Sequence, residues 1–123
     1  MRFDKLTIRT QEAFQAAQAV AVSHQHQAVD VEHFLLAMLT SEPSSIRPLL
    51  EKAGTNVRGL QSELEADLRG RARVEGQSAT YGSAMTGRLQ ETFNRAFVKA
   101  EKMGDDFVTG EHMLLAILED SGA

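Results

Sequence analysis

Residues 31–39, VEHFLLAML, and residues 110–118, GEHMLLAIL, are two versions of one nine-residue stretch. The match extends in both directions without a gap, so that residues 7–39 align with residues 86–118 at a constant offset of 79. Fourteen of the 33 aligned positions are identical, where unrelated sequences of this composition would share about two. The identical pairs are Thr7/Thr86, Arg9/Arg88, Gln11/Gln90, Glu12/Glu91, Phe14/Phe93, Ala17/Ala96, Ala21/Ala100, Val29/Val108, Glu32/Glu111, His33/His112, Leu35/Leu114, Leu36/Leu115, Ala37/Ala116 and Leu39/Leu118. The chain is an internal duplication.

Each copy predicts a long helix followed by a short one. Apolar residues recur every three to four positions, which is the spacing of one helix face. In the second copy this face comprises Leu89, Phe93, Ala96, Phe97, Ala100 and Met103. Asp30 and Thr109 stand where the short helices should begin, as N-caps. The buried stripes of the short helices are predicted as Leu35, Met38 and Leu39 in one copy and Leu114, Ile117 and Leu118 in the other.

Two further helices are predicted between the copies, the first ended by Gly54. The first unit therefore has predicted helices at about 5–22, 31–40, 46–53 and 56–69. The sequence predicts an all-α fold of two pseudo-symmetric four-helix repeats in a single domain, residues 1–123. Repeat one covers about 5–70, a connector covers about 71–85, and repeat two covers about 86–123. Repeat two is incomplete, because it is shorter than repeat one.

Composition excludes several classes of protein. The net charge of −4 argues against the clustered basic surface of a nucleic-acid-binding protein. The absence of cysteine rules out disulfides and thiolate metal sites and suits a reducing, cytoplasmic location. We expect no signal peptide, because no apolar run follows the charges of MRFDK at residues 1–5. We expect no membrane association either, since no stretch approaches the roughly 20 apolar residues of a membrane span.

Several blocks in the same order resemble one known family. They are MRFDKLT at residues 1–7, QEA at 11–13, AQ at 17–18, VEHFLLAML, RPLLEKAG at 47–54, RVEG at 73–76, and GDDFVTGEHMLLAIL at 104–118. With them, the chain resembles the N-terminal domain of the Clp ATPases, most closely that of the ClpB disaggregases. The resemblance implies the same fold of two pseudo-symmetric four-helix repeats.

The resemblance also implies a function. Such domains lie at the mouth of a homohexameric ATPase ring, bind exposed apolar segments of unfolded or aggregated polypeptides, and deliver them to the central pore. The alternative is the adaptor-docking role of the equivalent domain in protease-linked relatives, ClpA and ClpC. This chain lacks a GxxxxGK[ST] phosphate-binding loop. We therefore expect no catalytic site and no cofactor here, with ATP and magnesium bound by the parent's ATPase modules, and we expect the isolated domain to be a monomer.

The resemblance implies that Thr7, Asp105 and Glu111 bind substrate. The duplication offers a structural alternative for two of them, because Thr7 repeats as Thr86 and Glu111 repeats as Glu32. Asp105 aligns with His26, so duplication does not explain it. Of the three residues, Asp105 is therefore the first at which we expect a functional role.

An apolar groove rimmed by polar groups is the second expected feature. Its candidate residues are Phe97 and Phe107, together with Leu89, Phe93 and Leu114. Phe93 is better explained as core, since Phe14 repeats it. Phe97 has Gln18 as its counterpart, and duplication does not require an aromatic residue there.

The histidines do not indicate catalysis. His33 and His112 occupy one repeated helix position without an HExxH pattern, which favours a structural hydrogen-bonding role. His24 and His26 fall in a polar stretch between helices, where we expect them to be solvated. No spacing supports a Ser-His-Asp arrangement, so a hydrolase is not expected.

Overall fold

The computed structural model describes residues 3–41, 44–76 and 80–119, and the regular structure in this part of the chain is almost entirely helical. The elements in order are a 3-10 helix, η1 (Phe3–Lys5), α1 (Ile8–Ser23), β1 (Ala28–Val29), α2 (Val31–Thr40), α3 (Ile46–Lys52), α4 (Val57–Gly70), β2 (Ala84–Met85), α5 (Gly87–Lys102) and α6 (Gly110–Leu118). The predicted all-α class is confirmed. Residues 120–123, the predicted end of repeat two, lie outside the described ranges, and the division into repeats and connector stays a prediction.

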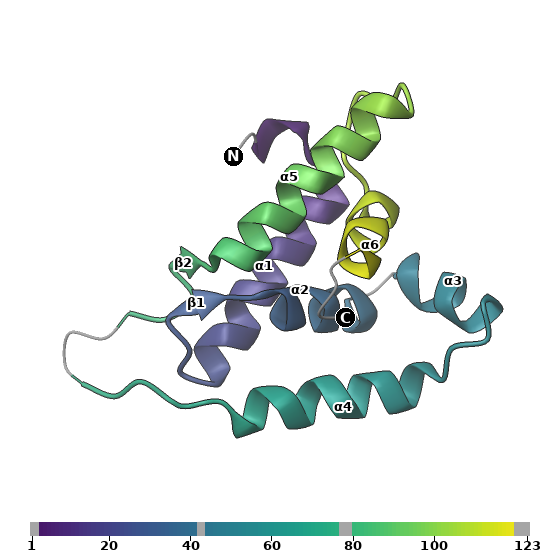
Figure 1. Ribbon diagram of the computed structural model, residues 1–123. Coiled ribbons are helices and arrows are strands. Elements are labelled where there is room, and N and C mark those ends of the chain that lie inside the picture. Colours follow the sequence, from purple (N-terminus) through teal and green to yellow (C-terminus); the bar gives the residue numbers. More distant parts are fainter. Residues whose placement is uncertain (1–2, 42–43, 77–79, 120–123) are drawn as a thin grey trace.

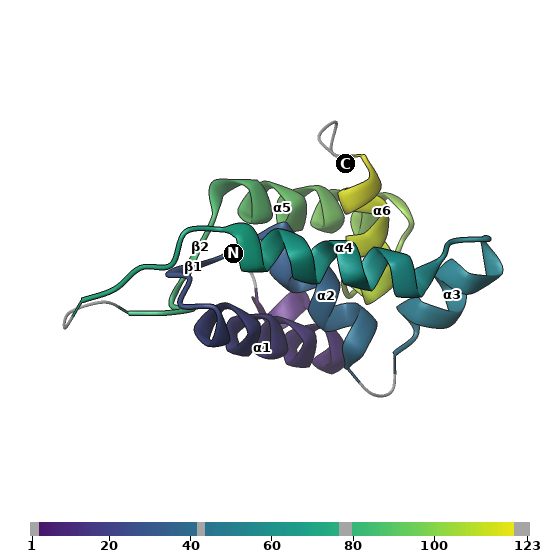
Figure 2. The ribbon, with the colours of Figure 1, turned by 90° about the horizontal axis from the view of Figure 1, so that it is seen from below.

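Helix α2 lies at the centre of the molecule. It contacts α1, α3, α4, α5 and α6, and Figure 2 shows it between α1 and α5. Helix α4 runs along one side beside α2, while α6 packs against α5 at the opposite end from the strands (Figure 1). The core therefore forms where the apolar second helices of both repeats meet the long helices.

The capping residues set the helix boundaries. The side chains of Thr7 and Thr86 accept the backbone N–H of the residue three positions on, and thereby start α1 and α5. Asp30 and Thr109 cap α2 and α6, as predicted. The predicted start of the first helix at residue 5 is wrong. Leu6 is buried in extended backbone that pairs with Val108, so the helix begins only after Thr7.

The two repeats interlock through short parallel pairings that the sequence did not predict. Strand β1 pairs with β2, and the N–H of Thr86 donates to the carbonyl of Val29 at 3.0 Å. The counterpart bond runs from the N–H of Thr7 to the carbonyl of Val108, also at 3.0 Å. Each repeat thus fixes the start of the other's long helix.

The connector returns to the strands through Gly82, where only glycine fits. Its φ is +68°, and a Cβ there would lie 2.8 Å from the carbonyl oxygen of Gln18. The amide of Gln18 in turn donates to the carbonyl of Gly82. This contact holds the end of the connector against α1.

A row of edge-to-face aromatic rings crosses the core from Phe3 through Phe14 and Phe93 to Phe34. Phe34 and Phe93 are fully buried, and their contact joins α2 of one repeat to α5 of the other. Such pairs add to the free energy of apolar burial. The row is therefore a main link between the repeats.

Some predicted burial is wrong, at positions where nothing in the described residues covers the helix. Leu118 is 62% exposed, whereas its counterpart Leu39 is buried beside the rest of repeat one. Met103 is 60% exposed, because α5 ends just before it. Leu114 and Ile117 are buried as predicted. None of the helices in the described ranges is both long and apolar enough to span a membrane.

Candidate functional site

The turn between α5 and α6 positions most of the predicted site residues. Gly104, with φ +74°, reverses the chain after α5, and the N–H of Asp105 donates to the carbonyl of Ala100 at 2.8 Å. Phe107 follows and is 51% exposed. Val108 then enters the pairing with Leu6 that brings the start of α1 against this turn.

A reciprocal cap holds the start of α6. The side chain of Thr109 accepts the N–H of His112, and Nδ1 of His112 accepts the N–H of Thr109 at 2.8 Å. The ring's proton is therefore on Nε2, which donates to a carboxylate oxygen of Asp105 at 2.9 Å. The predicted structural role of the repeated histidine is confirmed for His112, and His33 caps α2 in the same way.

This geometry corrects the inference made from Asp105. His26, its counterpart, contacts Nε2 of His33 through Nδ1 at 2.8 Å, just as Asp105 contacts Nε2 of His112. The position is duplicated after all: in both repeats it supplies the partner of the capping histidine, and only the residue type differs. A structural role thus exists for Asp105 beside the binding role, which stays a prediction.

His26 itself was also misread as a solvated loop residue. It is only 6% exposed, because the connector folds over the end of α1.

Thr7, Asp105, Phe107 and Glu111 converge on one open cavity of about 530 Å³. Residues more than 90 positions apart meet there, since the Thr7–Val108 hydrogen bond closes the structure at this point. Its lining residues are Thr7, Met103, Asp105, Asp106, Phe107, Thr109, Glu111, His112 and Leu115. Four of the five predicted site residues therefore share one surface.

The fifth, Phe97, lies in an adjoining cavity of about 440 Å³, which also has Asp105 and Asp106 in its lining. Phe97 is half-buried and packs against the core, while its outer part remains accessible. The other apolar candidates, Leu89, Phe93 and Leu114, are core residues. The two cavities share Asp105 and Asp106 in their linings, so both lie at the α5–α6 turn, and together they are called the groove.

The groove has an apolar floor and an acidic rim. Met103, Phe107 and Leu115 are 60%, 51% and 44% exposed around the larger cavity. Asp105 and Asp106 are exposed beside them, and Glu111 accepts a hydrogen bond from Ser45 at 3.0 Å. Such a surface can hold an apolar chain segment, and its acidic groups favour segments without clustered negative charge. No group of three or more histidine, aspartate or glutamate side chains in the described ranges is placed to hold a metal ion.

Sequence reasoning missed Met103 and Leu115 as site residues. Met103 continues the apolar period of α5, and Leu115 repeats Leu36, which is buried at 5% exposure. Both therefore had the signature of core residues. Only the lack of a covering element over Leu115, in the part of the chain that is described, distinguishes it from its buried counterpart Leu36.

The two repeated threonines provide a stability test of the Thr7 position. Thr7→Ala removes a helix cap and should lower the free energy of unfolding by about 1 kcal/mol. Thr86→Ala should cost about 2 kcal/mol, because the hydroxyl of Thr86 donates to the carboxylate of Asp30 at 2.8 Å, whereas that of Thr7 bonds to the neutral hydroxyl of Thr10 at 2.7 Å. Urea unfolding measures both, and equal losses would show that the bond to the Asp30 carboxylate contributes no more than the bond to Thr10.

Comparisons with known proteins place this geometry in a family. Residues 5–123 match the Clp repeat (R) N-terminal domain. The chaperone protein ClpB of Bacillus cereus is 37% identical over 123 residues, covering 99% of this chain and 14% of that protein. ClpB of Pseudomonas putida is 34% identical over 121 residues, covering 98% of this chain and 14% of the relative. The chain thus spans about one seventh of the length of these relatives.

Solved structures agree on the fold. The N-domain of ClpV from Vibrio cholerae superposes with a TM-score of 0.82 at 22% identity, covering 97% of this chain and 69% of that one. A complex of the ClpV N-domain with a VipB peptide gives 0.82 at 24% identity, covering 97% and 71%. The Hsp104 N-terminal domain from Candida albicans gives 0.82 at 17%, covering 96% and 76%. At these identities the likeness concerns the fold alone. By its sequence match over nearly the whole chain, this protein belongs to the Clp repeat N-terminal domains, with relatives among the ClpB chaperones.

Proposed function

We propose that this domain is the substrate-recognition module of a ClpB-like disaggregase, and that it holds exposed apolar segments of unfolded or aggregated proteins in the groove along the α5–α6 turn. One observation carries the proposal: Met103, Phe107 and Leu115 are each at least 44% exposed around a single cavity that also contains Thr7, Asp105 and Glu111. Contiguous exposed apolar side chains rimmed by polar groups are typical of protein-binding surfaces.

The wider role follows from the relatives. A parent chain like the ClpB chaperones would form a homohexamer in the cytoplasm, and its ATPase modules would bind ATP and magnesium. A solved ClpV N-domain holds a VipB peptide, which supports peptide binding by a domain of this fold. The domain would act by raising the local concentration of client segments at the ring, with weak contacts that release the client readily.

The groove can be tested with a pair of matched substitutions. Leu115→Ser should weaken binding of an unfolded client, such as reduced carboxymethylated α-lactalbumin, roughly fivefold, because about 1 kcal/mol of apolar burial is lost. Phe107→Ser should weaken it more. Leu49→Ser is the control: Leu49 is also 44% exposed, but it lies on α3 and lines neither cavity of the groove. Chemical-shift titration with the labelled domain measures all three.

The outcomes separate the proposed function from its alternative. Equal effects of Leu49→Ser and Leu115→Ser would contradict the groove. An adaptor-docking domain would instead bind one folded partner at one-to-one stoichiometry and ignore the unfolded client. Shifts that avoid Thr7 and residues 105–111 would refute the site residues while leaving the fold unaffected.

A further inference from the structure

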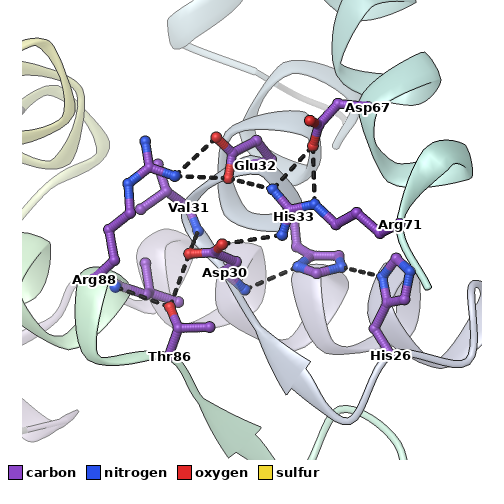
Figure 3. A network of polar contacts seen from close by, with 10 residues as sticks. His26, Asp30, Val31, Glu32, His33, Asp67, Arg71, Thr86 and Arg88 are labelled. Atoms are coloured by element: carbon purple, nitrogen blue, oxygen red, sulfur yellow. Dashed lines mark hydrogen bonds and ion pairs between the residues drawn. The ribbon is translucent and has the colours of Figure 1, made fainter. Parts of the chain in front are cut away.

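Two buried histidines of repeat one form a pair that the proposed function does not use. His33 is 1% exposed and His26 6% exposed. Nδ1 of His26 lies 2.8 Å from Nε2 of His33, and the ring of His24 stacks on that of His26. Figure 3 shows the pair in line with the start of α2 and next to Arg71.

The hydrogen bonds fix where the protons lie. The backbone N–H of Asp30 donates to Nδ1 of His33 at 2.8 Å, so the proton of neutral His33 is on Nε2. It is donated to Nδ1 of His26, whose own proton is therefore on Nε2. That nitrogen is buried with no hydrogen-bond partner among the described residues. Neither ring can take a second proton without losing one of these two bonds.

The surroundings oppose a charge on either ring. Burial, followed by electrostatic repulsion from His24, Arg71 and Arg73, lowers the pKa of His26, against a smaller opposing effect of Asp67. Burial, then His26 and Arg71, lowers the pKa of His33 to about 4, although Asp30 acts in the opposite direction. Because the pKa of each histidine is depressed, the hydrogen-bonded arrangement of the two neutral rings is fully stable above about pH 6.5. It loses stability as the pH falls below that value.

The loop that carries His26 holds both ends of the connector. The carbonyl of Gln25 accepts the N–H of Val74, the carbonyl of His26 accepts that of Gly82, and the carbonyl of Gln27 accepts that of Ala84. We propose that the His26–His33 pair is an acid-sensitive contact which, when either ring is protonated, releases the connector from residues 25–27 while the helices remain folded.

Repeat two supplies the reason to expect this response in repeat one alone. There the partner of the capping histidine is the carboxylate of Asp105, which attracts a protonated ring instead of repelling it. The duplicated position thus holds a His–His pair in repeat one and a His–Asp pair in repeat two, and the proposed release applies to repeat one.

The chain carries a natural reporter for the test. Tyr81 is its single tyrosine, tryptophan is absent, and the hydroxyl of Tyr81 donates to the carbonyl of Val74 within the connector. Between pH 7 and pH 5, tyrosine fluorescence should change, and the exchange protection of the Val74, Gly82 and Ala84 amides should fall up to about tenfold per pH unit for each proton taken up. Helical circular dichroism should stay constant over this interval.

Substitution at the duplicated position supplies the control. His26→Asp gives repeat one the pair found in repeat two and should remove the acid response. A variant that keeps the response would overturn the proposal, as would connector protection in the unmodified chain that persists until the helices unfold. If His26→Asp does not fold, ring ¹⁵N shifts of the unmodified chain decide: His26 or His33 must gain a proton as the protection falls, and two rings that both stay neutral refute the inference.

Discussion

Replacing Phe93 by alanine is expected to lower the free energy of unfolding by about 4 kcal/mol, since it removes a fully buried ring and leaves a cavity. The ring lies edge-to-face with Phe14 at 6.0 Å and with Phe34 at 5.4 Å, so both aromatic contacts of the inter-repeat row are lost. A domain of this size has about 5–15 kcal/mol of stability, and the change removes a large part of it. Urea unfolding followed by circular dichroism measures the loss.

The duplication provides the control for this substitution. Phe14 is the counterpart of Phe93, but it is only half-buried, so Phe14→Ala should cost about 2 kcal/mol. Phe93→Leu keeps most of the volume and should cost about 1.5 kcal/mol or less. A loss below about 2 kcal/mol for Phe93→Ala would show that the row of rings is not a principal link between the repeats.

Replacing Asp30 by alanine is the second large expected loss, at about 3 kcal/mol. One carboxylate oxygen accepts the Val31 N–H and the Thr86 hydroxyl, both at 2.8 Å, and the other accepts from Arg71 at 3.0 Å (Figure 3). The change removes a helix cap and leaves two donors from distant segments without their partner. Thermal or urea unfolding measures it.

The pH dependence gives an independent check on Asp30. Burial would raise the pKa of its carboxyl, but the hydrogen bonds from Thr86, Val31 and Arg71 outweigh burial and lower it. A carboxyl with a depressed pKa stabilises the fold above its unfolded value of about 3.9 and loses that contribution as the pH falls through the folded value. The difference in stability between Asp30→Asn and the unmodified domain should therefore shrink below pH 4. A difference that stays constant with pH would contradict the role of the charge.

Much of the fold could be predicted from the duplicated sequence, because the local signals that define its helices occur in both copies. Capping residues such as Asp30 and Thr109, and a histidine three positions later, specify where a helix begins by contacts within one turn. The parallel pairings of residues 28–29 with 84–85 and of Leu6 with Val108 were not predictable. Their strands are too short to carry an alternating pattern, and their partners are far away in sequence.

The placement of the candidate site residues was predictable in part, and for different reasons at each residue. The resemblance indicated Thr7, Asp105 and Glu111, and the structure brings them to one cavity. Met103 was assigned to the core because the spacing of apolar residues indicates one face of a helix, but it does not show whether another element packs on that face. Asp105 was interpreted as unrepeated because aligned residues were compared by identity, whereas the two repeats preserve a contact made by different side chains, His26 and Asp105.

The reciprocal pairing of the repeats bears on how such a domain can arise. The bond from Thr7 to Val108 and the bond from Thr86 to Val29 are related by the 79-residue offset, each donor in one repeat meeting an acceptor in the other. Two separate copies of a single ancestral repeat can form the same two bonds across a two-fold axis, as in an isologous homodimer. The interlock therefore has the symmetry of an isologous homodimer interface, with both halves carried on one chain, so that residues such as His26 and Asp105 can differ at equivalent positions.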